Sequence, residues 1–105
     1  MSTKIHPGIY LQEEITRRWW TQKQFAELIW KKVSEVNELL KGKRNITVQR
    51  DIILSALFDD PEKKRINLQI EYEYDTVKQS MNLDKVNSIK SHKQIIKKHE
   101  IFEDF

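Results

Sequence analysis

Apolar side chains recur at three- and four-residue intervals along most of this chain, which is the spacing of helices that are buried along one face. The spacing predicts helices over about residues 7–18, 21–29, 33–41, 47–58 and 63–81, followed by a basic helix that ends near Ile101 and Phe102. The expected inward positions are Leu11, Ile15 and Trp19 in the first helix, Phe25, Ala26, Leu28 and Ile29 in the second, Val33, Val36, Leu39 and Leu40 in the third, and Val48, Ile52, Ile53, Ala56 and Leu57 in the fourth.

Residues that favour helix ends lie at the boundaries of these predicted helices. Pro7 suits the first position of a helix, because its missing N–H would have no partner there. Thr21 and Gln24 have the spacing of a reciprocal capping box. Gly42 follows the third helix where a left-handed residue closes a helix, and Asp59-Asp60-Pro61 stops the fourth. We therefore predict an all-α domain of five to six helices.

One segment fits two structures. Its apolar residues Ile66, Leu68, Ile70, Tyr72 and Tyr74 alternate strictly with polar ones, which is the pattern of a strand. A helical stripe also passes through the segment and extends beyond the alternation, over Ile66, Ile70, Tyr74, Val77 and Met81. Periodicity alone leaves strand and helix open here.

Composition narrows the class of protein. The chain has 105 residues and 12.7 kDa, the size of one domain, and its lack of cysteine excludes disulfides and thiolate metal sites. No apolar run approaches the roughly 18 residues of a membrane span. Charged residues at Glu13, Glu14, Arg17 and Arg18 occupy the place of a secretory apolar region. We expect a cytoplasmic protein without a membrane partner.

The distribution of charge points to a polyanion. Residues 31–50 hold six Lys or Arg against two Glu, a net charge of +4, whereas residues 51–75 hold seven acids against three bases, a net charge of −4. A basic block beside an acidic one indicates a polyanion-facing surface and a different partner elsewhere.

The connection Trp30-Lys31-Lys32 joins two short helices tightly, which is the pattern of a helix-turn-helix. Such a fold lays its second helix in the major groove of DNA, while residues around it hold the phosphates. The residues placed to contact phosphate, at the start of the first of these helices and around the second, are Gln22, Lys23, Lys32, Lys43 and Arg44.

The outward face of the second of these helices carries the candidates for base contact. Ser34, Asn37 and Lys41 lie on this face, and an asparagine can pair with adenine and a lysine with guanine. Glu35 and Glu38 lie on the same face and are expected to repel phosphate. The flanking lysines must then supply the affinity.

Several stretches, in order, resemble HigA-type antitoxins, which are small helix-turn-helix regulators of the phage-repressor and XRE class. They are His6-Pro7-Gly8, residues 21–29, residues 36–44, Ile46-Thr47, and Asn67-Leu68-Gln69 with Tyr72. The resemblance covers about two-thirds of the chain, from His6 to Glu73. It implies a homodimer that binds double-stranded operator DNA, represses its own operon and neutralises a RelE-like toxin that cleaves mRNA.

The resemblance also bears on the local structure. It implies that residues 63–81 are helical. We expect residues 1–81 to form the helix-turn-helix domain and residues 82–105 a basic helical extension. Trp30 stands where the family usually has glycine, so that residue must avoid a positive φ or accept strain. Lys63-Lys64 replaces the family's Phe-Trp pair, and no proline follows Thr47.

Other chemistry finds little support in the residues. His92 and His99 are two helical turns apart, roughly 10 Å, which is too far to share one zinc ion. Asp59, Asp60 and Glu62 form the pattern of a cap and turn. We expect no metal, no cofactor and no enzymatic activity. Two rival hypotheses are a stand-alone phage-type regulator and a protein-interaction module that has lost DNA binding.

Overall fold

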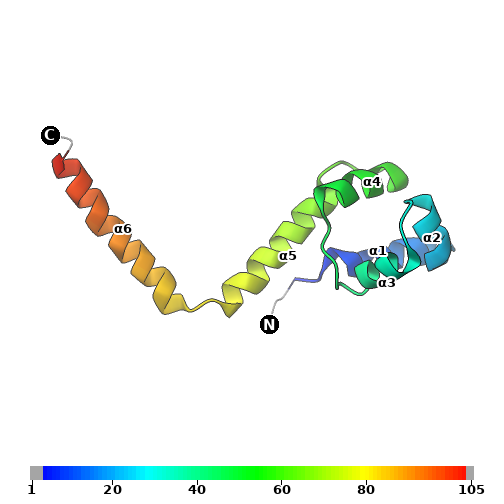
Figure 1. Cartoon of the computed structure of the whole chain (residues 1–105), viewed down its shortest axis with the longest axis horizontal. Coiled ribbons are helices and arrows are strands. Elements are labelled where there is room, and N and C mark those ends of the chain that lie inside the picture. Colours follow the sequence, from blue (N-terminus) through cyan, green and yellow to red (C-terminus); the bar gives the residue numbers. More distant parts are fainter. Residues whose placement is uncertain (1–3, 104–105) are drawn as a thin grey trace.

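A computed structural model describes the backbone of residues 4–103 and the side chains of residues 4–96. The described chain is all helical, as predicted, and its helices follow one another with short connections (Figure 1). The helices are α1 (Pro7–Arg17), α2 (Gln22–Leu28), α3 (Val33–Leu40), α4 (Val48–Phe58), α5 (Lys64–Ser80) and α6 (Leu83–Glu103). None of the described helices combines the length and the apolar character that crossing a bilayer requires.

The first four helices and the start of α5 enclose one hydrophobic core. Phe25 is fully buried at its centre and stacks on Phe58 of α4, with 6.2 Å between ring centroids. Trp20 also stacks on Phe58, with 6.1 Å between ring centroids. The remaining buried apolar residues are Leu11, Ile15, Ala26, Ile29, Val36, Leu39, Leu40, Ile46 and Leu54.

The helix starts follow the sequence signals. The Thr21 hydroxyl accepts the Gln24 N–H at 3.0 Å, and the Gln24 side chain accepts the Thr21 N–H at 2.9 Å, which confirms the capping box. His6 caps α1 through its Nδ1, which accepts the Gly8 N–H at 2.9 Å. Gly8 is required because a Cβ there would collide with the carbonyl oxygen of Leu39 in α3.

Three helices end in the same left-handed closure. The residue after the C-cap has positive φ at Trp19 (62°), Trp30 (55°) and Gly42 (76°). Gly42 confirms the predicted closure of α3. Trp30 accepts the strained conformation that a glycine adopts without cost. Trp19 was expected on the buried face of α1, but α1 ends at Arg17 and the turn leaves Trp19 92% exposed.

The predicted buried faces of α2, α3 and α4 also needed correction. Leu28 and Val33 are 48% and 45% exposed, because α2 ends at Leu28 and α3 starts at Val33, so the chain turns there. In α4 the predicted apolar face was only partly right. Ile53 and Leu57 are partly buried against the core, but Val48, Ile52 and Ala56 are exposed. The fully buried residues of α4 are Asp51, Leu54, Ser55 and Phe58.

Two buried polar side chains, Asp51 and Gln69, link α4 and the loop before it to α5, and the segment 66–74 is helical. The Asp51 carboxylate accepts the backbone N–H groups of Lys63, Arg65 and Ile66, at 2.7, 2.9 and 2.9 Å, and so caps α5. Gln69 is 2% exposed and accepts the Ile46 N–H at 2.8 Å. The strand interpretation is wrong, since residues 66–74 lie within α5 and Gln69, which the alternation places outside, is on its buried face.

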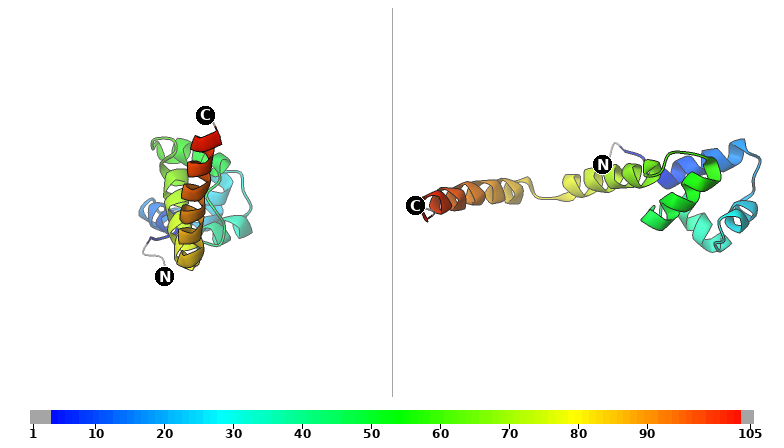
Figure 2. Two further views of the ribbon diagram at one scale, coloured as in Figure 1. Left: turned by 90° about the vertical axis from the view of Figure 1, so that its left-hand side faces the viewer. Right: turned by 90° about the horizontal axis from the view of Figure 1, so that it is seen from above.

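The second half of α5 and the whole of α6 project from the core. Met81 has extended backbone and separates the two helices at an elbow. The right view of Figure 2 shows α6 extending away from α1–α4, and the chain measures 65 × 30 × 21 Å.

Candidate nucleic-acid interface

The predicted helix-turn-helix is formed by α2, the Trp30–Lys32 turn and α3. The inner side of α3 is tightly packed: Val36 is fully buried and Leu39 is 2% exposed. Ala26 of α2 is 1% exposed, which fits the need for a small residue where helices cross. The outer side of α3 is polar and faces solvent. The geometry therefore defines the protein as a helix-turn-helix domain with an open recognition helix.

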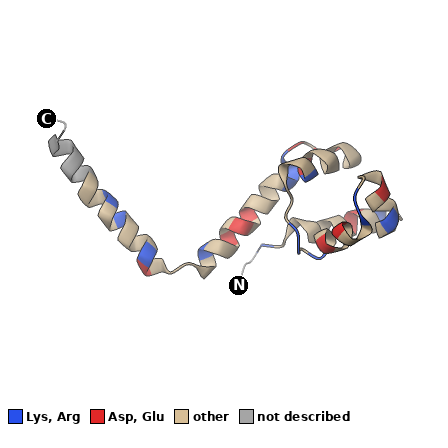
Figure 3. Ribbon diagram, in the orientation of Figure 1, with Lys and Arg blue, Asp and Glu red and all other residues tan. Residues whose placement is uncertain are grey.

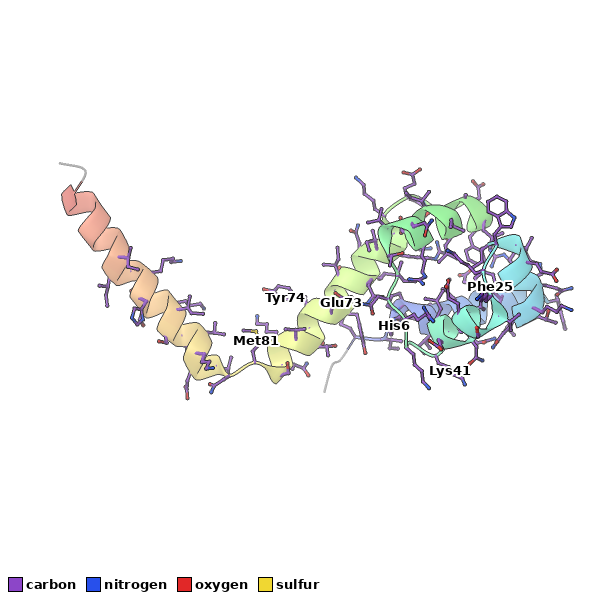
Figure 4. All side chains as sticks on the ribbon, in the orientation of Figure 1. His6, Phe25, Lys41, Glu73, Tyr74 and Met81 are labelled. Atoms are coloured by element: carbon purple, nitrogen blue, oxygen red, sulfur yellow. The ribbon has the colours of Figure 1, made fainter. Side chains whose placement is uncertain are left out.

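All eight predicted contact residues lie on α2, on α3 or at the two ends of α3. Lys23, Lys32, Ser34, Lys41 and Lys43 are exposed, and Gln22, Asn37 and Arg44 are partly exposed. The labelled Lys41 extends outward from the end of α3, whereas Phe25 points into the core (Figure 4). In the described part of the chain, the four lysines pair with no carboxylate, so their charges are available to a polyanion.

Asn37 is held in place by α2. Its side-chain Nδ2 donates to the Gln22 Oε1 at 3.2 Å, which links the recognition helix to the first turn of α2. An asparagine amide has two N–H donors and a carbonyl acceptor. Asn37 therefore keeps one N–H and its Oδ1, which is the pair of groups that reads adenine in the major groove.

Each glutamate on the recognition face is paired with an arginine. The Arg44 Nε donates to the Glu38 Oε2 at 2.9 Å. Arg50 of α4 lies 3.4 Å from a Glu35 carboxylate oxygen, and the Arg50 side chain is only 18% exposed. The expected repulsion of phosphate by these acids is therefore reduced. Sequence reasoning counted Arg50 in the basic block but missed its role, since nothing in the local spacing links it to Glu35.

The loop after α3 rests on His6. A Cβ on Gly42 would lie 3.3 Å from the His6 Cβ, so the backbone of this loop contacts the imidazole closely. The ring also packs edge-to-face on Tyr72 of α5, at 5.1 Å between centroids. Burial lowers the pKa of His6, because it disfavours the charged imidazolium, and the nearby Glu73 carboxylate opposes this only in part. A buried, neutral histidine thus supports the segment that carries Lys41, Lys43 and Arg44.

A further polar cluster, around Asp60, is formed by pairing with cations. The hydrogen bond from Arg65 at 2.7 Å lowers the pKa of Asp60, which also pairs with Lys64. Among the residues whose side chains are described, no three His, Asp or Glu gather closely enough to hold a metal ion. His92 lies on α6, and the His99 side chain falls outside the described residues.

Comparison with known proteins gives matches among solved structures. No protein-family model matches the chain, and no curated protein matches its sequence. The Pseudomonas aeruginosa antitoxin HigA with the higBA promoter matches with a TM-score of 0.69 and 27% identity, over 72% of this chain and 84% of that chain. A Pseudomonas aeruginosa protein in complex with its 18-base-pair operator DNA matches with a TM-score of 0.72 and 25% identity, over 80% of this chain and 91% of that chain.

A third structure comes from another organism. It is an addiction module antidote protein of a HigA family from Coxiella burnetii, which matches with a TM-score of 0.67 and 28% identity, over 89% of this chain and 91% of that chain. These likenesses confirm the resemblance to HigA-type antitoxins. The chain shares their all-α helix-turn-helix fold.

Proposed function

We propose that this protein is a DNA-binding antitoxin that binds the operator of its own operon through α3 and represses transcription. The observation that carries the proposal is the outer face of α3. It presents Ser34, Asn37 and Lys41 to solvent, it has unpaired lysines at both ends, and its two glutamates are neutralised by Arg44 and Arg50. Two structural neighbours, one with a promoter and one with operator DNA, support the same function.

In this proposal α2 contacts the phosphates and α3 contacts the bases. Gln22 and Lys23, at the start of α2, contact phosphate and set the position of the domain on the duplex. Asn37 then faces a base edge, already oriented by its bond to Gln22. Lys32, Lys43 and Arg44 hold the phosphates on either side of the groove.

We propose a homodimer, because the DNA-contacting surface of one domain is small. One recognition helix contacts only a few base pairs, so a single domain reads one half-site. Two copies on a palindromic operator place their recognition helices one helical turn apart, which multiplies the specificity. We therefore place two copies of the chain on each operator.

Titration of DNA tests the proposal directly. The purified protein is added to a labelled fragment from upstream of its own gene, and to a shuffled fragment of the same composition, at several salt concentrations. We expect tighter binding to the upstream fragment and a log affinity that falls linearly with log salt. Equal affinity for both fragments with no salt dependence would overturn the DNA-binding role and favour the protein-interaction module.

Neutralisation of a RelE-like toxin is the second half of the proposal. It is supported by the resemblance of the sequence to HigA-type antitoxins and by the antitoxin and antidote names of the structural neighbours. The surface that we propose for the toxin is either the acidic region 59–75 or the basic tail. Co-expression with a small basic protein encoded next to this gene tests the idea by growth rescue. Operator binding without such a neighbour would favour the stand-alone regulator.

A further inference from the structure

Val33, the first residue of α3, is an apolar residue on the surface of the recognition helix. It is 45% exposed, whereas Val36, three residues further on, is fully buried. Val33 also lies four residues before Asn37, so the two side chains are neighbours on successive turns of one helix face. Val33 therefore belongs to the surface that carries Asn37 and contributes little to the core.

The residues around Val33 are polar or charged. Lys31 and Lys32 lie in the turn before α3, and Glu35 and Glu38 lie on α3 itself (Figure 3). Among the eight residues of α3, all of which the structure describes, Val33 is the one apolar residue that is exposed. Its side chain has no hydrogen-bonding group to offer to a base or a phosphate. Val33 can therefore contribute to recognition only through an apolar contact.

The major groove of DNA presents one apolar group for such a contact. The base edges carry hydrogen-bond donors and acceptors, and thymine adds a C5-methyl group that apolar side chains contact. A valine against another base edge covers donors or acceptors without pairing them, which costs free energy. An apolar side chain on a DNA-contacting face therefore favours thymine over the other three bases.

Val33 is held in a fixed orientation before DNA binds. A β-branched side chain has one strongly preferred χ1 in a helix, so the two methyl groups of Val33 point in a defined direction. The helix is fixed as well, since Val36 and Leu39 are buried in the core and Asn37 donates to Gln22 at 3.2 Å. A contact between Val33 and a thymine therefore requires little further ordering of the protein.

We propose that Val33 is a specificity-determining residue whose methyl groups pack against the C5-methyl group of a thymine in the operator. This inference rests on the proposed DNA-binding function and adds a second base to the adenine that Asn37 can contact. The two residues are separated by four steps of about 1.5 Å along α3. Because base pairs are spaced about 3.4 Å apart, the thymine lies within about two base-pair steps of that adenine.

Replacement of thymine by uracil removes only the methyl group that this contact needs. Each thymine in the bound region of the upstream fragment is replaced in turn by deoxyuridine, and the affinity of the full-length protein is measured by fluorescence anisotropy. For the parent protein, we expect one thymine in a half-site whose replacement weakens binding about fourfold, the effect of one buried methyl group. Val33→Ala removes both Cγ methyl groups and adds no polar group. This variant should bind the thymine and uracil forms of that position almost equally.

Val77→Ala is the matched control. Val77 is 54% exposed and lies on α5, so the same atoms are removed from a valine outside the helix-turn-helix. We expect this variant to keep the parent's fourfold difference between thymine and uracil, whatever its overall affinity. Because the measured quantity is the ratio of two affinities of one variant, a general loss of stability does not imitate the expected result.

The adenine contacted by Asn37 is located in a parallel series of operators. Replacing adenine by 7-deazaadenine removes the N7 acceptor that an asparagine contacts. The adenine in question is the one whose replacement weakens binding of the parent and leaves binding of Asn37→Ala unchanged. We expect the sensitive thymine within two base pairs of it.

The outcomes separate this inference from the proposed function. Equal affinity of the parent for every uracil-substituted operator would overturn the role of Val33 and keep the DNA-binding function. A thymine that is equally sensitive in the parent and in Val33→Ala would do the same, and so would a sensitive thymine far from the adenine contacted by Asn37. Equal affinity of the parent for the upstream and shuffled fragments would overturn the operator-binding function itself.

Discussion

Arg44 and Glu38 are joined by a hydrogen bond of 2.9 Å across the end of the recognition helix. The guanidinium that we propose for phosphate contact is therefore already engaged in the DNA-free protein. Both side chains are substantially exposed, at 41% and 46%, so the pair contributes little to stability. Its main effect is expected on DNA binding, where phosphate and Glu38 compete for the same cation.

Replacing Glu38 tests this competition. We expect Glu38→Gln to raise operator affinity severalfold at low salt, because it removes a negative charge from the DNA face and releases Arg44. The gain should shrink as salt rises. Fluorescence anisotropy on the labelled upstream fragment measures both effects. Glu62→Gln, an exposed change after α4 that removes the same charge, is the control and should change the affinity much less.

Removal of the lysines should have the opposite effect. We expect Lys41→Ala, and more strongly Lys43→Ala with Arg44→Ala, to weaken operator binding and to flatten its salt dependence. Each lost phosphate contact reduces the slope of log affinity against log salt by about 0.9. Lys64→Ala removes one charge on α5 and serves as the control. Variants that keep the parent's affinity and slope would contradict the assignment of these residues to the DNA face.

The turn of the helix-turn-helix stores strain in Trp30. A non-glycine residue in the left-handed region costs about 1–2 kcal/mol, and the indole is 89% exposed, so packing does not offset that cost. We expect Trp30→Gly to raise the free energy of unfolding by about 1 kcal/mol, as measured in urea. Trp30→Ala removes the same indole but keeps the strained φ. Equal stability of the Gly and Ala variants would show that the backbone at this position is not strained.

The environment of His6 predicts a pH dependence of stability. Burial lowers the pKa of this histidine in the folded protein, while in the unfolded chain the pKa is about 6.5. As the pH falls below about 6.5, the unfolded state therefore binds a proton first, and stability is lost until the pH reaches the lower folded pKa. Above pH 7 this group should have no effect. We expect His6→Asn, which keeps an N-cap acceptor for Gly8, to lose this part of the dependence in urea unfolding at pH 5 and 7.5.

Local signals in the sequence were sufficient for the order of the helices. The capping box of Thr21 and Gln24, the left-handed Gly42 and the stop at Asp59 act within a few residues, so the spacing alone specifies them. The outer face of α3 was predicted for the same reason, since a helix with Val36 and Leu39 inward must turn its polar residues outward. Long-range partners were not predictable in this way. The pairing of Glu35 with Arg50 and of Gln22 with Asn37 depends on how separate helices pack.

The error in α4 has a specific physical source. A count of apolar spacing assumes that buried residues are apolar, and α4 buries Asp51 and Ser55 instead. The same assumption made the strand pattern over residues 66–74 look convincing, because Gln69 was counted as exposed. When a buried polar side chain accepts backbone N–H groups, as Asp51 and Gln69 do, the spacing of apolar residues alone does not identify the buried face of a helix.

Asp51 should therefore be one of the most sensitive polar positions in the protein. Its carboxylate is 2% exposed and accepts three backbone N–H groups at the start of α5, two of them on one oxygen. Asp51→Ala leaves three backbone donors, one of them in a buried and two in a part-buried hydrogen bond, without their partner, at a cost of about 3 kcal/mol. We expect Asp51→Asn to lose less, because the amide keeps one acceptor oxygen, and its N–H₂ faces only the remaining donor. Chemical denaturation of both variants, with Glu62→Gln as an exposed control, measures the difference. Losses below about 1 kcal/mol for Asp51→Ala would mean that α5 starts without this cap.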